Sequence, residues 1–77
     1  MTIETLDVVV LKRDIAAHGL QTGDLGTVVE RYGSDLFGVE FVAASGRTQA
    51  IVTLGLDDLR AVGDNDLVTV REAHATT

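Results

Sequence analysis

Short apolar runs separated by glycine-containing turns form the dominant pattern along this chain. The runs cover residues 6–11, 25–32, 37–42, 48–54 and 59–62. Each run is rich in β-branched residues and too short for an α-helix, which is typical of a strand. Alternation is clearest in the third run, where Phe37, Val39 and Phe41 share the face that we expect to point into the core.

Two glycines three residues apart mark the start of the second run. Gly23 is expected to adopt a positive φ in a tight turn, with Asp24 accepting hydrogen bonds from backbone N–H groups. Gly26 lies within the strand, where a glycine indicates a bulge or the close approach of another backbone. Because a bulge shifts the alternation, the sequence leaves open whether Val28 or Val29 points inward.

The other connections are predicted to be loops with single helical turns. A long loop at 12–22 is expected to hold one turn that begins at Asp14 and ends at Gly19. Residues 56–59 are predicted to form one 3₁₀ turn, capped by Asp57, before the last strand. This order of elements predicts an all-β, SH3-like barrel of about five antiparallel strands, closed by pairing of the last strand with the first.

The two ends of the chain are expected to lie outside this barrel. Residues 1–5 are predicted to be frayed, 6–62 to form the barrel and 63–77 to form a C-terminal tail. Within the tail, residues 67–71 are β-prone, and one option for them is an extra edge strand, with 72–77 disordered.

Composition narrows the class of protein further. The 77 residues are 45% hydrophobic, contain no cysteine and carry a net charge of −6, from twelve acidic and six basic residues. We see no signal peptide and no apolar run that approaches the ~20 residues of a membrane span, so we expect a cytoplasmic protein. The acidity favours a basic partner and disfavours nucleic acid, although charge also keeps a small apolar protein soluble.

Several of these stretches together resemble a known family. Residues 23–30 (GDLGTVVE), 39–42 (VEFV), 46–47 (GR), 52–54 (VTL) and 57–60 (DDLR) are similar to a family of small uncharacterised bacterial proteins known as a domain of unknown function. The resemblance implies an SH3-like fold and no assigned activity. The glycine core of residues 23–28 also resembles the KOW motif of ribosomal and elongation proteins, and the barrel of nitrile hydratase β-subunits, which implies binding rather than chemistry.

No set of residues here predicts a reaction, so we expect a protein that is not an enzyme and holds no cofactor or metal. Glu30 and Glu40 lie on adjacent predicted strands, but a solvated sheet face accounts for them. The aspartates between 57 and 66 lack the alternating order of a calcium loop. His18 and His74 are far apart and are expected to be surface residues, since a metal site needs more ligands.

Surplus apolar surface is the feature that points most directly to function. A barrel of this size cannot bury both faces of every strand, so some apolar residues are expected to meet a protein partner or a second copy in a homodimer. The candidate partner-binding residues are Val9, Leu11, Val29, Val42, either Ile51 or Val52, and the acidic Glu30 and Glu40. We therefore expect a non-catalytic protein-interaction module, of which an accessory or antitoxin-like subunit on a basic partner is one form.

Two alternative functions remain open at this stage. A KOW-like nucleic-acid-binding module would use a local basic rim, formed by Lys12, Arg13, Arg31 and Arg47. A helper that assists the assembly of an enzyme is implied only by the resemblance to nitrile hydratase subunits.

Overall fold

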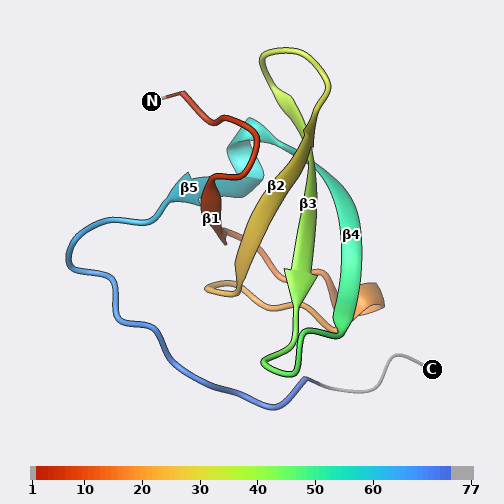
Figure 1. Ribbon diagram of the computed structural model, residues 1–77, viewed down its shortest axis with the longest axis vertical. Helices are drawn as coiled ribbons and strands as arrows, with labels where there is room; N and C mark the ends of the chain where they lie inside the picture. The colour runs from red at the N-terminus through yellow and green to blue at the C-terminus, as the bar shows by residue number, and fades with distance from the viewer. Residues whose placement is uncertain (1, 74–77) are drawn as a thin grey trace.

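Five strands form one antiparallel sheet in the computed structural model, which describes residues 2–73 (Figure 1). The strands are β1 (Val8–Leu11), β2 (Leu25–Arg31), β3 (Leu36–Val42), β4 (Thr48–Gly55) and β5 (Leu59–Ala61), in the spatial order β4-β3-β2-β1-β5. The helical elements of the described residues are two 3₁₀ turns, η1 (Ala16–His18) and η2 (Leu56–Asp58). The predicted small all-β, barrel-like fold is confirmed, including the 3₁₀ turn before the last strand and the pairing of β5 with β1.

A β-bulge in β2 resolves the register that the sequence left open. Val28 lies opposite Val39, and the next pair joins Glu30 to Gly38, so Val29 is the extra residue. Val28 is fully buried, whereas Val29 is half-buried. The bulge therefore sends Val28 into the core and displaces Val29 from the regular alternation.

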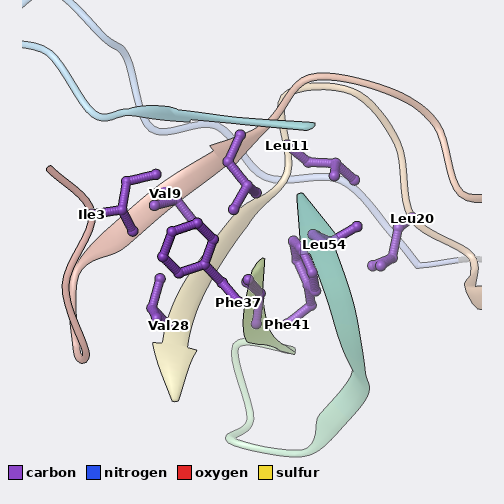
Figure 2. Packing of buried hydrophobic residues seen from close by; sticks show 10 residues of the cluster. Ile3, Val9, Leu11, Leu20, Val28, Phe37, Phe41 and Leu54 are labelled. Carbon is purple, nitrogen blue, oxygen red and sulfur yellow. The ribbon is translucent and has the colours of Figure 1, made fainter. Parts of the chain in front are cut away.

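The core lies on the inner face of the curved sheet. Figure 2 shows the Phe37 ring directed toward Val9 and Val28. The buried residues of the cluster are Ile3, Val9, Leu11, Leu20, Val28, Phe37, Val39, Phe41, Leu54 and Leu59. The prediction that Phe37, Val39 and Phe41 point inward is confirmed.

Three residues of the N-terminal region are placed differently from our expectation. Val9 and Leu11 are 1% and 0% exposed, so the prediction that they form surplus surface is wrong. Val9 lies opposite Gly26, and Leu11 opposite Leu59, which puts both side chains on the inner face. Ile3 is also buried in the core, so the segment before β1 is not simply frayed.

Gly26 lies at the close approach that its position in a strand predicted. A Cβ atom at Gly26 would lie 2.5 Å from Val39 Cγ1 and 2.9 Å from Phe41 Cε1. Both neighbours are buried core side chains with no free space to move into. Glycine at this position therefore lets the β2 backbone lie against the core residues of β3.

The loop between β1 and β2 turns as predicted but is capped differently. Gly19 and Gly23 have φ values of 68° and 96°, and Asp24 accepts a hydrogen bond from the Gln21 N–H. Asp14 does not cap η1; its carboxylate accepts hydrogen bonds from the backbone N–H and hydroxyl of Thr22. These bonds hold the pKa of Asp14 below its usual range, and the bond from the Thr22 N–H has the larger effect.

η2 is also capped by a different residue from the predicted one. Asp58, rather than Asp57, turns back, and its carboxylate accepts a 3.0 Å hydrogen bond from the Gly55 N–H. Asp58 also lies 2.8 Å from the Arg13 guanidinium. That side-chain bond to Arg13 is the main reason why the pKa of Asp58 is lowered.

Residues 62–73, which we call the strap, follow β5 without forming a strand. The option of an edge strand at 67–71 is therefore not realised, because these residues pair with no strand of the described chain and their apolar side chains point into solvent. In Figure 1 the strap swings away from β5 and passes the end of the β3–β4 hairpin. Residues 74–77, with His74, lie outside the described residues.

Candidate interaction surface

The outer face of the sheet carries a row of side chains that crosses four strands. Val8 lies opposite Thr27, Thr27 opposite Glu40, and Glu40 opposite Ile51. The two apolar ends of the row are open to solvent, since Val8 is 49% and Ile51 62% exposed. One carboxylate thus lies between two exposed aliphatic side chains, an arrangement suited to a partner with apolar and basic groups.

The outer face brings together some of the predicted partner-binding residues. Val42 is 47% exposed and follows Glu40 by two residues along β3, on the same side of the sheet. Glu30 lies opposite Gly38 on this side too. Of the two alternatives in β4, Ile51 is exposed while Val52 packs against the core.

Glu30 and Glu40 are offset along the sheet. Glu40 is opposite Thr27, three residues before Glu30 on β2. The Glu40 carboxylate accepts a 2.6 Å hydrogen bond from the Thr48 hydroxyl, which fixes its position beside β4. These two side chains are therefore separate acidic points on one surface.

Two of the four predicted basic residues form ion pairs within the chain, whereas Lys12 and Arg47 form none in residues 2–73. Arg13 forms the ion pair with Asp58, and Arg31 lies 3.7 Å from Glu4 and donates a 2.9 Å hydrogen bond to the Gly33 carbonyl. Arg31 and Arg47 lie at opposite ends of β3, because Arg31 is opposite Phe37 and Arg47 follows the turn after Val42. The structure therefore does not bring Arg31 and Arg47 into one rim.

Two further arginines attach the strap to the barrel. Arg60 on β5 makes two parallel 2.8 Å hydrogen bonds to the carboxylate of Asp66. Arg71 donates hydrogen bonds to both carboxylate oxygens of Asp24, and the bond to Oδ1 is 2.9 Å long. It also donates a 3.0 Å hydrogen bond to the Gly19 carbonyl. These contacts raise the pKa of both guanidinium groups and lower the pKa of Asp66.

A groove of about 650 Å³ lies beneath the strap. One wall comes from the turn that leads into β2, a second from the turn after β3, and the third from residues 66–71 of the strap. Sequence reasoning missed this groove because no local pattern links Arg71 to Asp24, which is 47 residues away.

Among the described residues, no three histidine or acidic side chains gather in a way that could hold a metal ion. Nor does any helix in residues 2–73 have the length and apolarity that crossing a membrane requires.

The fold and this surface define a small five-stranded all-β domain with one acidic and apolar outer face. Residues 5–61 match the model of DUF4926, a domain of unknown function. The match spans the whole sheet, and the chain belongs to this family. Searches of curated proteins and of solved structures give no significant match.

Proposed function

We propose that this domain is a non-catalytic protein-interaction module that associates with a second copy of itself and with a basic partner. The observation that carries the proposal is the row on the outer face, where Glu40 lies between exposed Val8 and Ile51. Exposed aliphatic side chains favour burial against another protein, and the carboxylate selects one that is positively charged.

The order of the strands supports a more specific assignment of the fold. A long loop, three meandering strands, a 3₁₀ turn and a short last strand that returns to β1 are consistent with an SH3-like barrel. Such a barrel acts by presenting its surface, which fits an accessory or antitoxin-like subunit. A cytoplasmic location is the setting that we propose for it.

The charges favour a basic protein over nucleic acid. Four of the six basic residues already hold carboxylates of this chain, namely Arg13, Arg31, Arg60 and Arg71. Phosphate binding depends on free Lys and Arg, and engaged guanidinium groups would have to leave their partners first. A KOW-like nucleic-acid interface is therefore the less supported alternative.

A charge-reversal experiment tests the proposal. The tagged chain is expressed in its source cells, cross-linked and isolated, and each recovered protein is then tested for binding with purified components. We expect a basic protein whose binding is weakened by salt and lost in the variant Glu30→Lys/Glu40→Lys. Asp64→Lys/Glu72→Lys is the matched control, because it makes the same change in charge at two exposed positions away from the sheet and should leave binding intact.

Three outcomes would contradict this function. Recovered proteins that bind both variants equally would show that the outer face is not used. A monomeric protein that retains no partner would remove the basis for an interaction module. Retention of RNA that is lost in Arg31→Glu and Arg47→Glu would favour the nucleic-acid alternative.

A further inference from the structure

The two edges of the sheet differ in how well they are protected. β5 is three residues long, has Arg60 at its centre and continues into the strap. β4 is eight residues long, contains no charged residue and no proline, and pairs on one side only within the described chain. Charge, proline and short length are the usual devices that prevent edge strands from pairing with other chains. β4 lacks all three.

The hydrogen-bond pattern shows which backbone groups of β4 face the open edge. The Leu56 N–H donates to the Asp35 carbonyl, and the register continues through Val39 opposite Val52. In an antiparallel ladder the hydrogen-bonded pairs alternate, so Val52 bonds β3, whereas Ile51 and Thr53 point their N–H and C=O groups away from it. Two donors and two acceptors therefore line the open edge in the middle of β4.

We propose that β4 pairs antiparallel with β4 of a second copy, about a two-fold axis at Val52. This rests on the proposed function as a self-associating module and names the surface that it uses. In this register Ile51 lies opposite the partner's Thr53, and Thr53 opposite the partner's Ile51. The N–H and C=O groups that each copy leaves at its edge then satisfy one another.

Charge supports a second copy as the occupant. Two chains of net charge −6 repel at most contacts, but β4 itself is neutral. A strand without charged residues is therefore where two acidic copies approach each other with the least repulsion. The edge is thus complementary to itself in hydrogen bonding, and it carries no charge that would oppose the pairing.

Single cysteines test the register directly, because the chain has none of its own. The variants Ile51→Cys, Val52→Cys and Thr53→Cys are oxidised, and disulfide-linked dimers are followed on non-reducing gels. Residues at the axis of this pairing have Cα atoms about 4.5 Å apart, within disulfide range, whereas diagonal neighbours are about 7 Å apart. We expect Val52→Cys to cross-link fastest; faster cross-linking at Ile51→Cys or Thr53→Cys, or none at all, would overturn the proposed register.

Sedimentation equilibrium separates the edge from the outer face. Thr53→Pro removes the N–H that faces the edge, and Ile51→Lys places charge beside the axis; both should weaken dimerisation at least about tenfold. Val8→Lys probes the outer face alone, and Val68→Lys is the matched control, since it adds the same charge to an exposed aliphatic position on the strap, outside both surfaces. Circular dichroism checks folding, and Ile51→Lys decides the question if Thr53→Pro does not fold.

The failures of this inference and of the proposed function are distinguishable. A dimer that is broken by Val8→Lys and unaffected by Ile51→Lys would overturn edge pairing while leaving an interaction module. A monomeric protein that still binds a basic partner through Glu30 and Glu40 would do the same. A monomer that binds no protein would overturn both.

Discussion

Replacement of Gly26 by alanine tests whether the close approach of β2 to the core is real. The substitution adds one methyl group at a point 2.5 Å from Val39 Cγ1 and 2.9 Å from Phe41 Cε1. Ordinary carbon contacts are about 3.5–4.0 Å, so either the β2 backbone or the two core side chains must move by about 1 Å. Val39 and Phe41 are 0% and 2% exposed, which leaves them no solvent to move into.

The expected cost follows from two opposing effects. Overpacking of a core costs about 1–3 kcal/mol. Replacement of glycine by alanine returns about 0.4–1 kcal/mol, because it restricts the unfolded chain. We therefore expect Gly26→Ala to lower the free energy of unfolding by about 1–2 kcal/mol. For a domain of this size each kcal/mol corresponds to about 4–8 °C in melting temperature.

Urea denaturation followed by far-ultraviolet circular dichroism measures this change. Gly55→Ala is the matched control, because its φ is −86° and an added Cβ would meet Asp58 at an ordinary 3.7 Å. We expect that control to stay within about 0.5 kcal/mol of the wild type. In a Val39→Ala background the Gly26→Ala cost should shrink by about 1 kcal/mol, since the obstructing methyl group is gone. An unchanged cost there, or a Gly26→Ala protein as stable as the control, would refute the close approach.

Three further perturbations have expected outcomes. Phe41→Ala should lower the free energy of unfolding by about 3–5 kcal/mol in urea titrations, and an unshifted midpoint would remove Phe41 from the core. The bond to Arg13 lowers the pKa of folded Asp58, so the folded state binds fewer protons than the unfolded state. The free energy of unfolding should therefore be constant above about pH 4 and fall as the pH drops further. The fall should be shallower in Asp58→Asn, and equal slopes in the two proteins would exclude Asp58 as a source of the pH dependence. Arg71→Ala should speed proteolytic cleavage within the strap and leave the melting of the barrel unchanged, whereas a lower melting temperature would make the strap part of the folding unit.

The meander of β2, β3 and β4 could be predicted because its signals are local. Turn glycines separate the runs, and alternation in β3 fixes which side chains point inward. The bulge was anticipated from Gly26, but its effect on Val28 and Val29 depended on the pairing with β3. Local pattern therefore specifies the strands, and non-local pairing specifies their faces.

β1 shows why the candidate surface was predicted only in part. Its residues are apolar on both faces, so alternation cannot distinguish inside from outside. The structure buries Val9, Val10 and Leu11 together, and what decides the inner face is that Val9 lies opposite Gly26. Glycine on β2 leaves room for core side chains, a fact that only the register reveals. The exposed residue of β1 is Val8.

The option of an edge strand in the tail was not realised because a local strand signal was present but no partner strand was available. Residues 67–71 have the composition of a strand, but a strand needs a partner, and the nearest edge is the short β5. The ion pairs of Arg60 and Arg71 instead hold this segment as a strap over a groove. Ile3 likewise enters the core from a segment with no periodic signal.

The ion pairs change what the composition implies about partners. Each engaged arginine contacts or belongs to a segment outside the five strands: Arg13 contacts η2, Arg31 lies 3.7 Å from Glu4 in the N-terminal segment, and Arg60 and Arg71 join the strap to the barrel. Of twelve acidic and six basic residues, four of each are consumed in this way, which leaves eight carboxylates and two cations without an ion-pair partner in residues 2–73. Among the side chains without an ion-pair partner, acidic groups therefore outnumber basic groups by more than the two to one of the whole sequence. This charge distribution supports the proposed preference for a basic protein over phosphate. It also supports the proposed pairing along the edge of β4, because a neutral strip is where two acidic copies repel each other least.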